Sequence, residues 1–126
     1  QAIIAQRLVR LNCVKCSKPY TPSALEQSWL DNILELGESV SSMRGLGCSA
    51  CNGTGYAGRR GVYEWLEMDP DLINATLRSD PITFMQLARE RISGQSMAHH
   101  ALELVRQGLT SLAEAQRINF SSDDES

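Results

Sequence analysis

The sequence predicts an α+β, mainly helical fold, in which a tetracysteine subdomain precedes a small helical C-terminal bundle. The first half of the chain holds two CxxC pairs, and the second half holds several helix start signals. Between them, glycine-rich residues 48–60 are expected to form a loop and residues 62–68 a strand. The length of 126 residues suits one domain or two small subdomains.

The N-terminal residues are expected to form a helix. Ile4, Leu8 and Leu11 fall at i, i+4 and i+7, which places them on one face of a helix over residues 2–11. No capping residue precedes this helix and no initiator Met is present, so we expect the sequence to be cut from a longer protein.

A second helix is expected over residues 22–36, between the two cysteine pairs. Its N-terminus fits either Thr21, which a proline follows, or Ser23, which is spaced from Glu26 as a capping box. Gly37 is the expected stop signal.

Further helices are expected after the strand. Their expected ranges are 70–78, 81–92, 97–107 and a short last helix that starts at Thr110 or Ser111. Asp69 and Asp80 each precede a proline, as an N-cap precedes the first helical residue. We expect the apolar faces of the first three of these helices to pack together, and the acidic residues 121–126 to be disordered.

The four cysteines carry the clearest chemical signal. Cys13 and Cys16 form one CxxC pair, Cys48 and Cys51 form the other, and no further cysteine exists. Two residues between cysteines let both sulfurs of a turn face one point, so two such turns supply the closed tetrahedral shell of a structural zinc ion. The sequence therefore favours a tetracysteine zinc-binding subdomain.

Other interpretations of the cysteines stay open at this point. They are buried thiols without a ligand, a thioredoxin-like redox pair, structural disulfides and a metal other than zinc. A redox pair would need a βαβ context, which is missing here. No signal peptide or apolar run of about 20 residues is present, so we expect a cytosolic protein whose thiols stay reduced.

Residues 53–58 match the dinucleotide-binding pattern GxGxxG, and we reject that interpretation. The pattern requires a strand before it and a helix after it. Here a cysteine turn precedes it and a strand follows. We expect the glycines instead to let backbone amides approach the sulfurs of Cys48 and Cys51.

Three segments resemble the secretion ATPases that drive type II secretion and type IV pilus assembly. Residues 48–64 (CSACNGTGYAGRRGVYE) resemble that family's CxxCxxTGYxGRxGIYE. Residues 5–16 (AQRLVRLNCVKC) resemble AQRLVRxxCxxC, and residues 108–114 (GLTSLAE) resemble its closing G-x-T-S/T-x-x-E. Within the family, these segments resemble the mannose-sensitive haemagglutinin pilus branch. One departure is His100 and Ala101, where the family usually has an acidic residue and a glycine.

The resemblance implies a hexameric, RecA-like parent ATPase in the cytoplasm, at the bacterial inner membrane. It implies four parts: the end of an ATPase core helix (1–12), the zinc subdomain (13–60), a strand with a helical C-terminal subdomain (61–120) and a disordered tail (121–126). Implied partners are neighbouring subunits and an inner-membrane platform protein. ATP and Mg are implied for the full-length parent alone, because this sequence lacks a P-loop. We therefore expect no ATP hydrolysis by this chain.

Two other functions remain as alternatives. Residues 48–55 also fit the CxxCxGxG repeat of J-domain co-chaperones, although the first cysteine pair lacks the glycines. A zinc-ribbon nucleic-acid binder would need a basic face, and the net charge of −3 opposes it, so no nucleic-acid partner is expected.

A few polar and aromatic residues have both structural and functional interpretations. We expect Trp65, Tyr56 and Tyr63 to lie in the core. Arg59 and Arg60 would be a solvated pair or a contact to another subunit or the platform protein. His99 and His100 are expected to be one solvent-facing and one half-buried side chain rather than metal ligands.

Chelation is expected to loosen residues 13–60 and to leave helices 70–118 formed.

Overall fold

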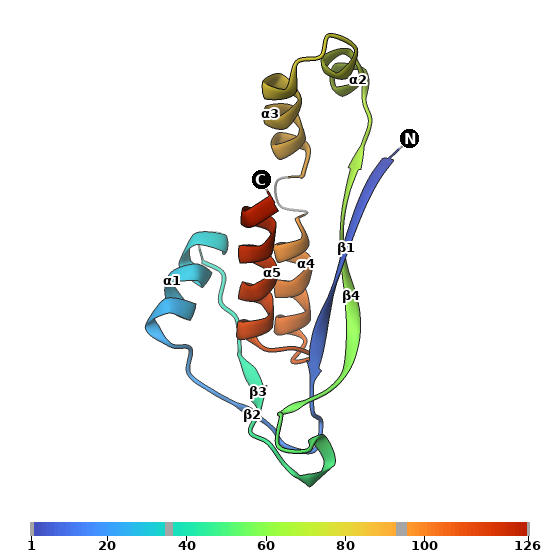
Figure 1. Cartoon of the computed structure of the whole chain (residues 1–126). Coiled ribbons are helices and arrows are strands. Elements are labelled where there is room, and N and C mark those ends of the chain that lie inside the picture. Colours follow the sequence, from blue (N-terminus) through green and yellow to red (C-terminus); the bar gives the residue numbers. More distant parts are fainter. Residues whose placement is uncertain (1, 35–36, 93–95, 126) are drawn as a thin grey trace.

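The computed structural model describes residues 2–34, 37–92 and 96–125. The elements in chain order are β1 (Ala2–Asn12), β2 (Ser17–Pro19), α1 (Ala24–Ile33), β3 (Met43–Gly45), the 3-10 turn η1 (Ser49–Cys51), β4 (Tyr56–Glu67), α2 (Pro70–Leu77), α3 (Pro81–Ile92), α4 (Met97–Arg106) and α5 (Leu112–Glu125). The molecule is elongated, with the strands β1 and β4 running along one side and α4 and α5 packed beside them (Figure 1). The cysteine turns lie at one end and the helices α2 and α3 at the other (Figure 1).

The N-terminal segment is a strand, so the expected helix over residues 2–11 is wrong. β1 pairs antiparallel with β4 along almost its whole length, in a register that places Ile4 opposite Trp65. Ile4 and Leu8 lie on the exposed face of this two-stranded sheet, whereas Val9 and Val62 are buried on the other face. The paired residues of β4 lie 44 to 65 positions away in the sequence, so the local helical spacing did not reveal the pairing.

The main hydrophobic core joins the two halves of the chain. Its buried members are Val9, Leu30, Val62, Met97, Ala101, Leu102, Leu104, Val105, Leu112, Ala115 and Ile118. Leu30 belongs to α1, between the cysteine pairs, and it packs in the same cluster as α4 and α5. The division at residues 60 and 61 remains a prediction, but this core extends across it.

A second, smaller core lies at the far end of β4. It consists of Leu66, Leu72 and Ala88, with partly buried side chains from α3 around them. The apolar faces of α2 and α3 therefore pack on each other and on the end of β4, while α4 packs with α5 in the main core. The expectation that all three helices pack together is wrong in this respect.

Most helix starts follow the predicted capping signals. Asp69 and Asp80 each accept a backbone N–H from the first turn of the helix that they precede, at 3.0 and 3.1 Å. Ser23 forms the predicted capping box with Glu26, so α1 starts at Ala24 rather than after Thr21. α1 ends at Ile33, before the expected stop at residue 37, and residues 35 and 36 lie outside the described part of the chain.

Three other expectations differ from the structure. β4 begins at Tyr56, inside the expected loop, and the helical backbone of α5 continues through residues 121–125, where a disordered tail was expected. Trp65 and Tyr63 are 62% and 48% exposed, so the expectation that they are core residues is wrong. Tyr56 is half-buried. Among the described residues, no helix is long and apolar enough to cross a membrane.

Candidate metal centre

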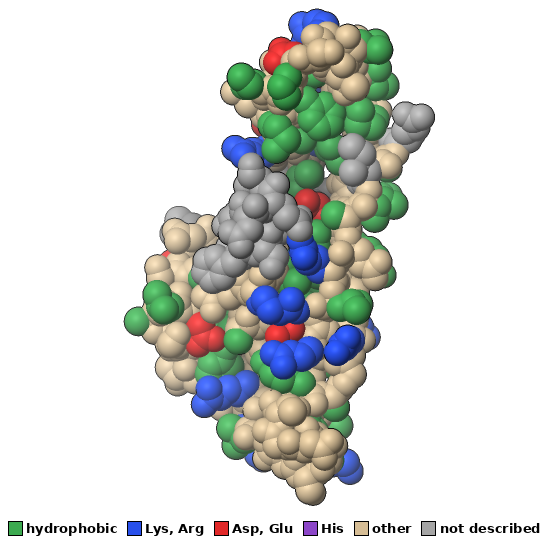
Figure 2. Space-filling model, in the orientation of Figure 1, with side chains coloured by type: hydrophobic (Ala, Val, Ile, Leu, Met, Phe, Trp, Pro, Cys, Tyr) green, Lys and Arg blue, Asp and Glu red, His purple; other side chains and the backbone are tan. Residues whose placement is uncertain are grey.

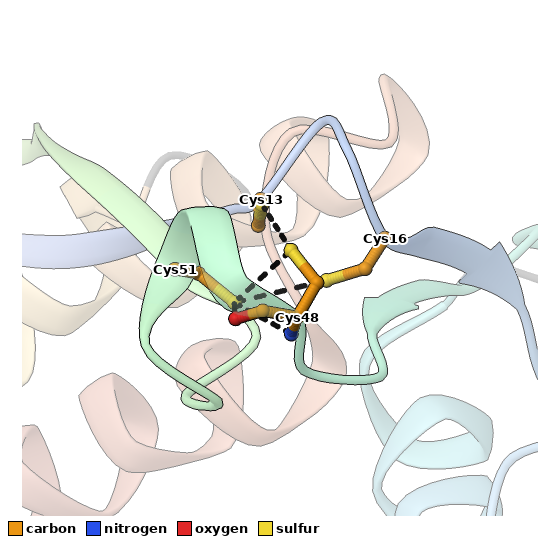
Figure 3. A group of neighbouring side chains, drawn as sticks. All are labelled: Cys13, Cys16, Cys48 and Cys51. Carbon is orange, nitrogen blue, oxygen red and sulfur yellow. Dashed lines mark hydrogen bonds between the residues drawn. The ribbon is translucent and has the colours of Figure 1, made fainter.

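The structure brings the four predicted cysteines to one point at the end of the molecule. Cys13 directly follows β1, Cys16 precedes β2, Cys48 precedes η1 and Cys51 ends it. Their side chains point toward one another from the two turns (Figure 3). All four sulfur atoms lie within 4.8 Å of one another, and three of the four residues are buried.

The spacing of the sulfurs fits a tetrahedral zinc ion. The Sγ atoms of Cys13 and Cys48 are 3.8 Å apart, those of Cys16 and Cys51 3.9 Å, and those of Cys48 and Cys51 3.7 Å. Zinc–sulfur bonds of about 2.3 Å in a tetrahedron place the sulfurs about 3.8 Å from one another. The cysteines are free thiols, which rules out disulfides in this structure. The donor set therefore fits a zinc ion with no open coordination position.

Backbone amides point at two of the sulfurs. The N–H of Gly47 donates to the Sγ of Cys16 at 3.3 Å, and the N–H groups of Cys48 and Gly55 donate to the Sγ of Cys51 at 3.2 Å each. Gly47 and Gly55 have φ of +102° and +82°, a region that side chains disfavour. The expected role of glycines in admitting amides to sulfur is thus confirmed at Gly55, for Cys51.

The strand β3 passes very close to the second cysteine turn. A Cβ atom on Gly45 would lie 2.0 Å from the carbonyl oxygen of Gly55, and one on Gly55 would lie 2.4 Å from the oxygen of Gly45. The two backbones are in direct contact here. Because glycine has no Cβ, these two positions allow the close approach that sets the position of the turn that carries Cys51.

The protonation of the cluster is uneven. Burial raises the pKa of Cys16 to about 11, although the Gly47 amide opposes this. Burial acts in the same direction on Cys51, but the amide donors of Cys48 and Gly55 outweigh it and lower the pKa to about 6. Cys51 is therefore readily a thiolate at neutral pH, and a divalent ion that binds there displaces the proton of the Cys16 thiol.

Two other groups of predicted site residues lie elsewhere. His99 and His100 are both partly buried on α4, so the expected solvent-facing histidine is absent. The Nδ1 atom of His99 is 2.7 Å from the Oγ of Ser96, and the Nδ1 atom of His100 accepts the backbone N–H of Tyr63 at 2.9 Å. Arg59 and Arg60 are exposed on β4.

Asn12 supports the cysteine turn, and the sequence analysis did not single it out. Its side-chain amide donates to the carbonyl oxygens of Met43 and Gly108 at 3.2 Å each, and its backbone N–H donates to that of Leu109 at 2.8 Å. The sequence holds two hints of this role: Asn12 immediately precedes Cys13, and Gly108 is the first residue of the GLTSLAE motif. Their meeting in space was not readable from the sequence.

Known proteins match nearly the whole chain. The family described as "Type II/IV secretion system protein" matches residues 1–117. The type II secretion system ATPase E of Vibrio cholerae is 33% identical over 120 residues, which is 95% of this chain and 23% of that protein. A type II secretion system protein E of Aeromonas hydrophila is 34% identical over 93% of this chain and 23% of its own length. The type IV pilus assembly ATPase PilB of Thermus thermophilus is 28% identical over 89% of this chain and 13% of its own.

This chain thus spans less than a quarter of the length of these relatives. The resemblance of its three motifs to secretion and pilus ATPases is confirmed, because the family match covers far more than half of the residues. The chain belongs to the type II/IV secretion system protein family.

Proposed function

We propose that this chain is the C-terminal zinc-binding and motion-transmitting module of a hexameric secretion or pilus-extension ATPase. The proposal rests mainly on four sulfurs gathered within 4.8 Å of one another in a chain that belongs to this family. Zinc supplies a rigid cross-link between two distant turns, and it adds no reaction of its own at a closed site. The metal therefore has a structural role, and the module as a whole transmits movement.

In the full-length protein, ATP and Mg bind at a part that this chain does not contain. We expect the chain to contact neighbouring subunits of a homohexamer and the inner-membrane platform protein, on the cytoplasmic side of that membrane. Two of its relatives are named ATPases of type II secretion and of type IV pilus assembly, which supports a role in one of these machines. The chain by itself is expected neither to hydrolyse ATP nor to bind nucleic acid.

Metal analysis tests the first half of this proposal. Purified chain should contain one zinc per molecule by elemental analysis, and its four thiols should react slowly with a thiol reagent until a chelator is added. Cys16→Ser should lower the zinc content, whereas Ser49→Ala, an exposed change in the other cysteine turn, should leave it unchanged. Zinc-free protein with four freely reactive thiols would overturn the proposal.

The second half needs the full-length protein. Cys16→Ser there should reduce pilus assembly or secretion more than it reduces ATP hydrolysis, because the catalytic site is elsewhere and the transmission is weakened. Equal loss of both activities would contradict a transmitting role. Turnover of ATP by this chain alone would contradict its assignment as a module without catalysis.

A further inference from the structure

One edge of β1 is closed by side chains of residues 110–117, just before and within the start of α5, instead of by another strand. The hydroxyl of Thr110 donates to the carbonyl oxygen of Arg10 at 2.6 Å, and the backbone N–H of Arg10 donates to the carboxylate of Glu114 at 2.9 Å. The guanidinium of Arg117 donates to the carbonyl oxygen of Leu8 at 2.7 Å. These residues satisfy backbone groups that an edge strand would otherwise leave open.

Glu114 is the centre of this arrangement. Its side chain is 2% exposed, and besides the Arg10 backbone it accepts hydrogen bonds from the side chains of Arg10, at 2.9 and 3.1 Å, and Arg117, at 3.0 Å. Breaking the ion pairs of a buried carboxylate strongly destabilises the fold, because the loss of its partners leaves an uncompensated buried charge. In Figure 2, basic side chains gather around an acidic group on this part of the surface.

The same segment also reaches the start of β4. The hydroxyl groups of Ser111 and Tyr56 are 2.7 Å apart, and the Arg10 guanidinium lies 4.2 Å from the centre of the Tyr56 ring. Tyr56 follows Gly55, whose N–H donates to the Sγ of Cys51 and whose carbonyl oxygen accepts the N–H of Cys13 at 2.9 Å. The contacts of Ser111 and Arg10 with Tyr56 therefore lie one residue from Gly55, whose backbone bonds to both cysteine turns.

On β1, residues 108–114 also hold the chain directly beside the first cysteine pair. Arg10 is held by Thr110 and Glu114, and Asn12 is held by the carbonyl oxygens of residues 108 and 109. The next residue is Cys13. Residues 108–117 thus hold both strand ends that lead into the cluster, one next to each cysteine pair.

We infer that residues 108–117 form a clamp that positions the metal ligands, with Glu114 as the central positioning residue, so that zinc binding and docking of the first turn of α5 are coupled. Coupling of this kind is reciprocal: a weaker clamp lowers metal affinity, and loss of metal loosens the clamp. The inference rests on the proposed metal site. Residues that orient metal ligands typically contribute about 10- to 100-fold to affinity.

Glu114→Gln tests the clamp, because it keeps the size of the side chain and removes its charge. Zinc affinity is measured by competition with a chromophoric chelator, and cobalt absorption reports the ligand geometry. The variant should bind zinc about 10-fold more weakly than the original chain. The matched control is Glu103→Gln, which alters a carboxylate that is 57% exposed on α4 and should leave affinity unchanged.

Two further variants separate positioning from general destabilisation. Thr110→Val removes one hydroxyl donor at nearly constant volume and should also weaken zinc binding. It serves as the test of the clamp if Glu114→Gln fails to fold. Leu72→Ala should destabilise the second core without changing zinc affinity, since Leu72 lies in the separate cluster on α2.

The outcomes distinguish the clamp from the metal site itself. Zinc binding by the original chain and equal affinity in a folded Glu114→Gln or Thr110→Val variant would overturn the clamp and leave the site intact. Absence of zinc binding by the original chain would overturn both. In the reciprocal measurement, chelation should speed hydrogen exchange at the amides of Arg10 and Asn12, and unchanged exchange there would contradict the coupling.

Discussion

Gly45→Ala should weaken the metal centre without touching a cysteine. The added Cβ would lie 2.0 Å from the carbonyl oxygen of Gly55, and a normal contact needs at least 3.0 Å, so one backbone must move by about 1 Å. That movement pulls the Gly55 amide away from the Sγ of Cys51 and its carbonyl away from the amide of Cys13. We expect zinc affinity to fall about 10- to 100-fold, which is about 1.4–2.7 kcal/mol.

The assay is chelator competition on folded protein, with folding checked by circular dichroism. Gly45 does not adopt a left-handed backbone, so alanine is disfavoured there by the contact alone. Gly53→Ala is the matched control: Gly53 has φ of +77° but open space around its Cβ position. It should cost about 1–2 kcal/mol of folding free energy through backbone strain and reduce zinc affinity less than Gly45→Ala. Unchanged affinity in Gly45→Ala would refute the argument.

Three further predictions concern the strand, the buried carboxylate and the metal. Leu66→Ala should lower the free energy of unfolding by about 2–5 kcal/mol and Trp65→Ser by less than about 0.5 kcal/mol in urea titrations, because Leu66 is buried and Trp65 is exposed. Burial raises the pKa of Glu114, but hydrogen bonds from Arg117 and Arg10 outweigh it and lower the pKa. Its stabilising effect is therefore complete above the ordinary value of about 4.3 and lost as pH falls further, and Glu114→Gln should flatten the acid-unfolding profile there. Chelation should release four reactive thiols while most far-UV helicity remains, because the main core contains no cysteine; complete loss of helicity would contradict this.

The strand β1 shows where sequence patterns are ambiguous. Ile4 and Leu8 are four residues apart, a spacing that puts side chains on one face of a helix and also on one face of a strand. The pattern extends to Leu11, which made the helix more plausible. The deciding factor was the pairing with β4, whose paired residues lie 44 to 65 positions away. Tertiary pairing of this kind overrides local preference and leaves no local trace.

Capping signals and cysteine spacing were more informative because their chemistry is local. Asp69, Asp80 and Ser23 start their helices as predicted, since a side chain that accepts its own first-turn amide needs no distant partner. The cysteine cluster was predictable for a related reason: two turns with the same geometry and no other thiols leave one way to complete a tetrahedron. The exposure of Trp65 and Tyr63 was not predictable, because it depends on which face of β4 the helices cover.

The arrangement of the two cores suggests how the module can transmit force. β4 runs from Tyr56, next to the cysteine turn, to Glu67, where α2 and α3 pack on Leu66. Twelve residues of strand extend about 40 Å. In the proposed module, a metal ion bound by the cysteine cluster would hold one end of β4, and the helix pair with its own core holds the other end. The two ends of the strand are thus held by separate interactions. Under the proposed transmitting role, movement of the clamped end would reach α2 and α3 through the paired strands β1 and β4, whose register shifts once, between Arg10 and Asn12. The smaller core would then change its own contacts separately from the cysteines.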